Sequence, residues 1–431
     1  MGMDRNTIIG FVLIGALLIG MFYINSKSNQ EYLAKKKHEE DSIAALKPKV
    51  DTVAARIDSL KADSIRKVNQ QLPASAFLID SSGKEETPVL ENDVVKITFT
   101  NKGAQPKEVE LKKFKTFDGK PLLLQKGKFN KISYKINAAG RPVETADIPF
   151  VAGEKTVNAD KSQSISFTLK DSSGQAITHT YTMRPDDYMV DFNISMQGAD
   201  KLISQNTINL LWQTELPQVE KTVSYEKQQT HICWYYNGNY NFTGMGSSGD
   251  EKFEKTTSWL AINPQFFVAA LVAKDKFQNA DMNWVAPADS LGIICQATTN
   301  ARLNVTAATA NIPLQLYYGP NDYNVLDKYD NNMHQIVTYG SGLFAFVKYI
   351  NRHFLLPIWD FLRSHIANYG IVILLLTLII RLITSPILYK SYVSGAKMKA
   401  LKPEIDKLKA KFGDDKQGFS MEQMKIGRAH V

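Results

Sequence analysis

Two stretches of the chain are longer and more apolar than the segments of a typical water-soluble protein. Residues 7–24 (TIIGFVLIGALLIGMFYI) carry no charge over eighteen positions, and residues 369–389 (YGIVILLLTLIIRLITSPILY) carry one, Arg381. A helix needs about 20 such residues to cross the hydrocarbon core of a bilayer. A third apolar run, residues 259–272, has only fourteen residues and contains Pro264, which favours a buried core element. The chain is therefore predicted to cross a membrane twice.

The charges around these two segments predict their orientation. Seven lysines and two acidic residues lie between positions 387 and 411, directly after the second segment. Basic residues accumulate on the cytoplasmic side of spans, so this end is predicted to be cytoplasmic, with the N-terminus also inside and residues 27–365 outside. Four lysines within residues 27–37 give the opposite local signal, but long translocated domains largely escape the charge rule. A cleaved signal peptide is the alternative for the first segment, although no A-x-A-like site follows it.

The region between the two predicted spans alternates apolar and polar residues with a period of two. Residues 164–169 and 188–196 show this alternation, and turn signals such as Asp118-Gly119 and Asn237-Gly238 separate the runs. The pattern is typical of strands with one buried face. Roughly 250 residues of such strands can bury one large core, so an antiparallel β-sandwich is predicted over residues 77–338.

Helical patterns flank this region. Residues 27–71 are charged with a short amphipathic stripe, which predicts a helical stalk or, alternatively, a short coiled coil. Residues 343–363 predict a basic amphipathic helix, which lies in the headgroup plane or packs on the β domain. After the second span, apolar residues repeat by three and four until Gly413 ends the helix. Ser420 and Gln423 form a capping box that opens another, so a helical hairpin is predicted.

The sequence holds no assembled catalytic or metal-binding pattern. The seven histidines are scattered, and two cysteines are too few for a disulfide framework. Residues 244–249 match G-x-G-x-x-G, but no apolar helix follows them, so we expect a loop. Cys233 and Cys295 can form a disulfide in an oxidising compartment, which the sequence does not decide. We expect neither a cofactor nor an enzymatic activity.

Arg381 is the strongest candidate for a functional residue. It is residue thirteen of the 21-residue second segment, where a charge costs about 2.5–3.5 kcal/mol on the insertion scale. Such a cost is tolerated where the side chain faces water, a partner or a polar groove. Thr377, four residues earlier, lies on the same helix face. The alternative is that the span ends near Ile380 and Arg381 snorkels to the cytoplasmic surface.

Several stretches together resemble the YidC family of membrane protein insertases, in a Bacteroidetes-like form. They are the opening MDRNTIIGFVLIGALLI, the runs SWLAINPQFFVAALV and LYYGPNDYNVLD, and the second apolar segment with its continuation to Lys425. The resemblance implies a periplasmic β-supersandwich between two transmembrane helices, followed by a cytoplasmic helical hairpin. Arg381 matches the arginine that this family places in a hydrophilic intramembrane groove. Thr377 matches a polar residue on the same face.

The same resemblance implies a function. The protein would insert and fold nascent integral membrane proteins in the cell inner membrane, alone or with the Sec translocon, without hydrolysing ATP. A water-filled groove would lower the cost of moving polar backbone and charge across hydrocarbon. The implied partners are nascent membrane proteins, the ribosome, Sec translocon components and the lipid bilayer, with no specific nucleic-acid site and no cofactor.

The predicted organisation follows from these observations. In chain order, it comprises an N-terminal transmembrane anchor (1–26), a charged helical stalk (27–76), a periplasmic β-sandwich domain (77–338), an interfacial amphipathic helix (341–365), a transmembrane helix of the insertase core (366–389), an incomplete cytoplasmic hairpin (390–425) and a sequencing or cloning scar (426–431). The last six residues fit neither the hairpin nor the family, so we expect a fragment that lacks later spans.

An alternative function comes from a cluster of aromatic residues. Five of them surround the predicted Asn237-Gly238 turn: Trp234, Tyr235, Tyr236, Tyr240 and Phe242. Such rings more often fill the edge of a sandwich, but they can also stack on a sugar. The alternative is therefore a membrane-anchored periplasmic β-sandwich protein that binds carbohydrate. It leaves Arg381 and the lysine-rich hairpin unexplained.

Overall fold

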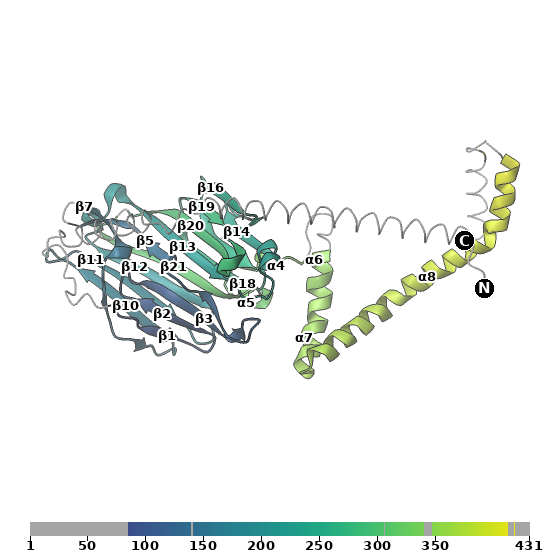
Figure 1. Ribbon diagram of the computed structural model, residues 1–431, viewed down its shortest axis with the longest axis horizontal. Coiled ribbons are helices and arrows are strands. Elements are labelled where there is room, and N and C mark those ends of the chain that lie inside the picture. The colour runs from purple at the N-terminus through teal and green to yellow at the C-terminus, as the bar shows by residue number, and fades with distance from the viewer. Residues whose placement is uncertain (1–84, 139–140, 306, 340–346, 413–417, 419–431) are drawn as a thin grey trace.

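The structure is a computed structural model, and it describes residues 85–138, 141–305, 307–339, 347–412 and 418. The predicted anchor and stalk, the second hairpin arm and the predicted scar lie outside these residues. The described residues form a β domain and a set of helices that extend away from it (Figure 1).

Four antiparallel sheets make up the β domain. The ten-stranded sheet contains, in spatial order, β15 (Asn239–Gly244), β14 (Thr230–Tyr236), β17 (Thr257–Pro264), β18 (Phe267–Phe277), β21 (Thr309–Pro320), β12 (Met189–Gln197), β11 (Ala176–Met183), β10 (Gln163–Lys170) and β8 (Val151–Ala152), with β9 (Thr156–Val157) also paired to β10. The five-stranded sheet contains β16 (Ser248–Phe253), β19 (Asn279–Val285), β20 (Ile293–Asn304), β13 (Thr207–Pro217) and β5 (Lys131–Ser133).

Two smaller sheets and several short helices complete the domain. The four-stranded sheet contains β1 (Val89–Glu91), β2 (Val95–Thr100), β3 (Gln105–Lys115) and β4 (Pro121–Gln125), and the two-stranded sheet contains β6 (Lys135–Ala138) and β7 (Arg141–Glu144). The short helices are η1 (Thr145–Asp147), α3 (Ala199–Leu202), η2 (Ser204–Asn206), α4 (Val223–Gln228), η3 (Asp289–Leu291), α5 (Tyr323–Asp327) and η4 (Met333–Ile336).

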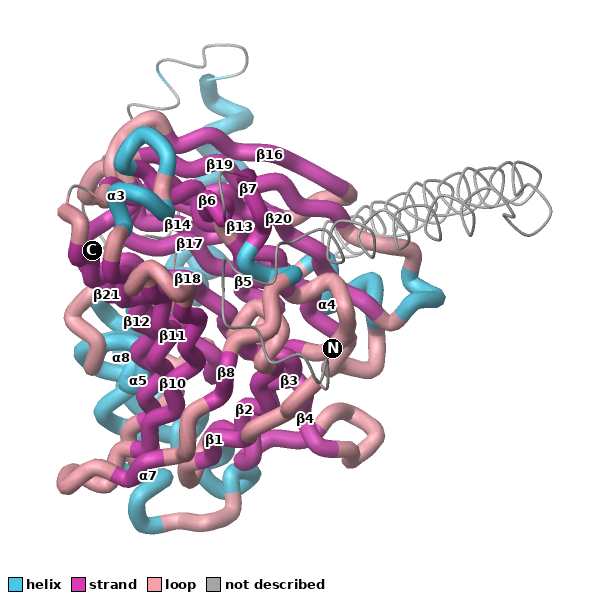
Figure 2. Tube along the Cα trace, turned by 90° about the vertical axis from the view of Figure 1, so that its left-hand side faces the viewer, coloured by secondary structure: helices cyan, strands magenta, loops and turns pink. Residues whose placement is uncertain are grey.

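Figure 2 draws the strands of these sheets in magenta. Aromatic side chains join the sheets into one core. Phe99 of β2 contacts Tyr181 of β11, with ring centroids 4.6 Å apart, and Trp234 of β14 contacts Phe253 of β16 at 5.4 Å. The four-stranded and five-stranded sheets therefore both contact the ten-stranded sheet. Each such ring removes a large apolar area from water, roughly 150–250 Å² per aromatic side chain.

The period-two pattern predicts which side chains enter this core. The alternate residues of β10 and β12 that face inward are buried: Ile165, Phe167, Leu169, Val190, Phe192, Ile194 and Met196. The residues that alternate with them between Ser164 and Thr168 and between Asp191 and Ser195 are half-buried and polar. The predicted strands over residues 164–169 and 188–196 are therefore confirmed, because one face of this part of the sheet remains open to solvent.

The apolar run 259–272 lies in β17 and β18, near the middle of the ten-stranded sheet. Both faces of these strands are buried over residues 259–264 and 267–273, and the segment after β21 contacts one of them. The indole N–H of Trp259 donates to the carbonyl of Asn331 at 2.9 Å. A strand buried on both faces needs no alternation, which explains the continuous apolar run. The prediction of a core element instead of a span is confirmed.

A buried histidine connects three parts of the core. His179 of β11 donates from Nδ1 to the carbonyl of Ala104 at 3.1 Å, and its Nε2 lies 2.9 Å from the hydroxyl of Tyr134. A carbonyl oxygen can only accept, so the proton lies on Nδ1 and Tyr134 donates to Nε2. Burial lowers the pKa of His179 to about 4, so the ring is neutral at neutral pH.

Two features of the sequence have structural explanations. Cys233 on β14 and Cys295 on β20 are both buried and both free, and their strands belong to different sheets. The predicted loop over residues 244–249 requires a correction, because Gly244 ends β15 and Gly249 lies within β16. A side chain at Gly249 would collide with the indole of Trp284. This glycine therefore serves strand packing.

Candidate functional site

The β domain is followed by a chain of helices. They are α6 (Val347–Ile350), the π-helical turn η6 (Asn351–Leu355), α7 (Leu356–His365) and α8 (Tyr369–Phe412). The single helix predicted over residues 341–365 is therefore interrupted by a π-helical turn, and residues 340–346 lie outside the described part. Pro357 is the second residue of α7 and has no N–H to donate to the wide turn before it. The proline accounts for the break in regular hydrogen bonding.

Among the described residues, η6 carries the polar contacts that join these helices to the end of the β domain. The side-chain amide of Asn351 donates to the carbonyl of Tyr339 at 2.9 Å, and the guanidinium of Arg352 lies 4.8 Å from the ring centre of Tyr323. Farther along, Phe354 is 40% exposed and Phe361 is 64% exposed. An exposed apolar stripe beside basic residues is typical of a helix at a membrane surface.

A tight corner joins α7 to α8. The Oδ1 atom of Asn368 accepts a hydrogen bond from the backbone N–H of Gly370 at 2.9 Å, which caps the N-terminus of α8. The rings of Trp359 and Tyr369 are stacked across the corner, with centroids 6.2 Å apart. Val372 is buried there. These contacts set the direction in which α8 leaves the β domain (Figure 1).

α8 is one continuous helix of 44 residues. Its segment Tyr369–Pro403 is apolar and long enough to cross a membrane, the single such helix among the described residues. It begins at Tyr369, whereas the span was predicted to begin at 366, and it continues through position 389 into the first arm of the predicted hairpin. Residues 369–389 alone extend about 30 Å, which matches the hydrocarbon core. Large apolar side chains on it are exposed: Ile373, Leu374, Leu378, Leu382, Ile383 and Ile387.

A polar stripe follows one face of this span. Arg381 and Thr377 are both exposed and lie one turn apart, and Thr384 and Ser385 fall within about 100° of them around the helix axis. Only Arg381 and Thr377 were predicted from the sequence. Spacings of three and four from Arg381 were the signal that would have found the other two.

The hydroxyl groups of the stripe bond to the helix backbone. Thr377 donates to the carbonyl of Ile373 at 2.8 Å, and Ser385 donates to the carbonyl of Leu382, also at 2.8 Å. Pro386 has no N–H, so it leaves the carbonyl of Leu382, four residues earlier, without its helical donor. The Ser385 hydroxyl replaces that donor, which matters in hydrocarbon, where water cannot.

The guanidinium of Arg381 has no hydrogen-bond or ion-pair partner within the described part of the chain. Arg381 and Thr377 therefore lie on the same face, as predicted, but the described residues supply no second wall opposite them. An isolated arginine at this depth has a large desolvation cost. The stripe is thus chemically suited to face water or a polar partner.

The part of α8 that follows position 389 is the part predicted to lie in the cytoplasm. All seven lysines that follow position 389 are exposed: Lys390, Lys397, Lys399, Lys402, Lys407, Lys409 and Lys411. These lysines lie on α8, the helix that also carries the polar stripe. The arrangement places a basic surface directly after an apolar one, which suits anionic headgroups or an anionic partner.

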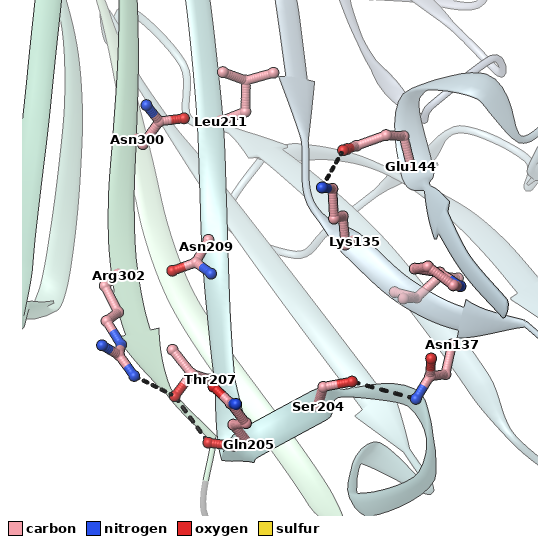
Figure 3. A pocket seen from close by; sticks show the side chains of 12 residues that line it. Lys135, Asn137, Glu144, Ser204, Gln205, Thr207, Asn209, Leu211, Asn300 and Arg302 are labelled. Atoms are coloured by element: carbon pink, nitrogen blue, oxygen red, sulfur yellow. Dashed lines mark hydrogen bonds and ion pairs between the residues drawn. The ribbon is translucent and has the colours of Figure 1, made fainter. Parts of the chain in front are cut away.

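The β domain has a polar pocket of its own (Figure 3). It has a volume of about 390 Å³ and lies between β13, β20 and the β6–β7 hairpin. Lys135 lies 3.9 Å from Glu144 on one wall, and Arg302 donates to Thr207 at 3.4 Å on the other. No aromatic side chain lines this pocket. It therefore lacks the rings on which the carbohydrate alternative depends.

The aromatic cluster around Asn237-Gly238 lies elsewhere in the domain, on the β14–β15 hairpin. The ring of Trp234 is buried, and that of Tyr235 is stacked on Trp259 with centroids 6.0 Å apart. These rings mainly pack against the sandwich. The structure thus favours the structural role that the sequence analysis weighed against sugar binding.

Family profiles match almost all of the described chain. The profile described as the YidC periplasmic domain matches residues 88–351, and the profile described as the 60Kd inner membrane protein matches residues 361–430. A curated relative from Parabacteroides distasonis, named membrane protein insertase YidC, is 30% identical over 98% of this chain and 69% of its own length. A relative of the same name from Phocaeicola vulgatus is 29% identical over 98% of this chain and 68% of its own length.

Solved structures show weaker similarity. A crystal structure of an active YidC insertase with its first transmembrane domain resolved is 15% identical over 78% of this chain and 63% of its own length, with a TM-score of 0.33. A galactose mutarotase related enzyme from Lactobacillus acidophilus is 9% identical over 54% of this chain and 97% of its own length, with a TM-score of 0.37. Scores this low have no bearing on the activity of this chain.

Proposed function

This chain belongs to the YidC family of membrane protein insertases, and on that premise we propose that α8 forms one wall of a hydrophilic groove through which substrate proteins enter the inner membrane. The observation that carries the proposal is the polar stripe of Thr377, Arg381, Thr384 and Ser385 on an otherwise apolar span. The facing wall would come from parts of the protein outside the described residues.

The stripe would act on the substrate through charge and hydration. Arg381 supplies a positive charge on a planar guanidinium that can bind a carboxylate through two hydrogen bonds. It would attract an acidic or polar segment of a substrate partway into the membrane. The adjacent apolar surface of α8 would let the substrate helix move out into lipid. Each polar group that finds a partner in the groove avoids a transfer cost of several kcal/mol in hydrocarbon.

We also propose the topology that the charge pattern predicts. The anchor (1–26) and α8 would cross the membrane, with the stalk (27–76) and a β-supersandwich (77–338) in the periplasm between them. The interfacial helix would occupy 341–365, and the lysine-rich continuation of α8 would enter the cytoplasm as the first arm of a hairpin within 390–425. The exposed lysines support this orientation.

The proposed partners follow from the same surfaces. The basic arm after position 389 suits the phosphate backbone of a ribosome, because seven exposed lysines lie along one helix end. The Sec translocon is proposed as a second partner from the family resemblance alone. Nascent membrane proteins are the substrates.

The decisive experiment replaces the charge of the stripe. In cells depleted of their own insertase and expressing the complete protein, Arg381→Ala is expected to slow insertion of substrates with acidic external segments about tenfold, equivalent to about 1.4 kcal/mol. Ile383→Ala, on the opposite face of α8, is the matched control and should insert normally. Arg381→Lys should be mild if charge suffices and severe if the guanidinium geometry matters. Normal insertion by Arg381→Ala at matched expression would refute the groove.

A further inference from the structure

Almost every open sheet edge in the described part of the β domain is protected. An open edge presents free backbone N–H and C=O groups, and proteins block it with short strands, charges or proline. Here β1, β5, β8 and β9 have at most three residues, β4 begins with Pro121, and β6, β7 and β16 carry charged residues. The exception is β15 at one edge of the ten-stranded sheet, which has six residues (NYNFTG) and neither a charge nor a proline.

The register of the β14–β15 hairpin shows which backbone groups are free. The two turn residues have positive φ, 49° at Asn237 and 81° at Gly238, and Tyr236 pairs with Asn239 across the turn. In a two-residue hairpin this closing pair is hydrogen-bonded, the next pair is not, and the two kinds of pair alternate from there. Residues of the pairs that are not hydrogen-bonded point their N–H and C=O away from the partner strand. The residues of β15 that point toward the open edge are Tyr240, Phe242 and Gly244.

Two aromatic side chains give this edge an apolar face. The rings of Tyr240 and Phe242 are stacked, with centroids 5.8 Å apart, and Tyr240 also contacts Trp259 at 6.0 Å. Phe242 is 42% exposed. Alternate residues of a strand share one face, so a strand added at this edge would place its own alternate side chains beside both rings.

We propose that β15 is a strand-addition site, which binds an extended, uncharged segment of another polypeptide as an eleventh strand of the large sheet. Backbone hydrogen bonds to Tyr240, Phe242 and Gly244 would hold the segment, and its apolar or aromatic side chains would pack on the Tyr240 and Phe242 rings. Because β15 has no charge, it has nothing with which to compensate the desolvation of a charged segment. The ligand class is therefore an uncharged, β-forming peptide.

A flexible segment suits this edge better than a second copy of the chain. A strand of six residues is about 20 Å long, and a stable dimer buries about 1,200–2,000 Å² in total. Two β15 strands meeting edge to edge would join through only three outward-facing residues each. A peptide can instead also bend over the exposed ring of Phe242. Identifying the segment with a translocated stretch of a membrane-protein substrate rests on the proposed function, whereas the site itself does not.

The test measures binding of a defined peptide to the full chain in detergent. The probe is a fluorescein-labelled, uncharged octapeptide of alternating valine, tyrosine and threonine, and the control probe carries N-methyl groups on alternate backbone nitrogens. We expect the N-methylated probe to bind at least about tenfold more weakly, since strand addition requires its N–H groups. Equal binding of the two probes to the unaltered protein would overturn the proposal, and this comparison needs no variant to fold.

A second test introduces a charge into β15. Phe242→Lys should weaken probe binding about tenfold, because lysine blocks an open edge, whereas Val151→Lys on the exposed opposite edge should not. Hydrogen exchange at Tyr240, Phe242 and Gly244 should slow when the probe binds, and unchanged exchange there would refute the site. A dimer that Phe242→Lys converts to monomer would assign the edge to a second copy and overturn the proposal. Arg381→Ala should bind the probe normally, so a failed groove and a failed edge give different results.

Discussion

The β domain and α8 satisfy their polar groups in different ways. In the β domain, buried groups from distant parts of the chain bond to one another, as His179 does with Tyr134 and Ala104. On α8, the hydroxyls of Thr377 and Ser385 bond to carbonyls within the same helix, and Arg381 stays exposed. A strand in a sheet has neighbouring strands that supply hydrogen-bond partners. The polar groups of a membrane span without such neighbours must bond to the backbone of the same helix. Contacts between distant parts of the chain therefore stabilise the β domain, whereas α8 leaves the charged group of Arg381 exposed.

The largest expected effect contrasts a core ring with an exposed leucine. Phe192 is fully buried and stacks on Tyr181 with centroids 4.6 Å apart, so Phe192→Ala should lower the free energy of unfolding of the β domain by about 3–5 kcal/mol. Leu382 on α8 is 71% exposed, so Leu382→Ala should leave that free energy unchanged. Near-UV circular dichroism during denaturation measures both. Equal destabilisation by the two changes would remove the contrast between the regions.

Burial of His179 is expected to make the free energy of unfolding of the β domain depend on pH. Its pKa is about 4 in the folded protein, below the ordinary value of 6.5, because burial disfavours the charged ring. The stability that it contributes is fully present above about pH 6.5 and is lost as the pH falls through 4, by about 3 kcal/mol. Denaturation midpoints between pH 7 and pH 4 measure this loss. His179→Phe should flatten that dependence, and an unchanged slope in the variant would contradict the assignment.

Glu226 should produce the opposite dependence. Its carboxylate is buried on α4 and accepts the backbone N–H groups of Val219 at 3.1 Å and Glu220 at 3.0 Å. Desolvation nevertheless raises the pKa of Glu226 to about 7. Its stability contribution is therefore present below about pH 4.5 and is lost as the pH rises through 7, by about 2–3 kcal/mol. Glu226→Gln should remove the loss in unfolding experiments at pH 5 and pH 8. If the variant lost stability over that interval as the unaltered protein does, another group would be responsible.

The smallest expected effect is at Ser385. Ser385→Ala leaves the carbonyl of Leu382 without a donor, which should destabilise the span by about 0.6 kcal/mol, the average for hydrogen bonds in membrane helices. Combining it with Pro386→Ala restores the backbone donor and should recover the loss. Thermal unfolding in detergent, compared across the two single variants and the double variant, measures the coupling. Additive effects would show that the hydroxyl does not replace the missing N–H.

The sequence predicts much of the β domain because period-two alternation is a local property. Residues 164–169 show this, since each position has the burial that its polarity predicts. The sequence was a poorer guide to which distant residues lie close together in space. The spacing of Cys233 and Cys295 does not reveal that they lie in different sheets, and the glycines at 244 and 249 match a nucleotide-binding pattern although one of them makes room for Trp284. Of the four residues in the polar stripe, Arg381 and Thr377 were predicted from the sequence as site residues, and that role stays a prediction.

The sequence alone determines the apolar span around Arg381, its basic continuation and the strand character of the region before it. These properties depend on residues within a few positions of one another, where hydrophobicity and periodicity act directly. Only the tertiary structure decides that His179 meets Tyr134 and Ala104, that residues 259–272 are covered on both faces, and that β15 remains an open edge. Each of these depends on which strands become neighbours, and that order is set by packing the whole core, which no local pattern specifies.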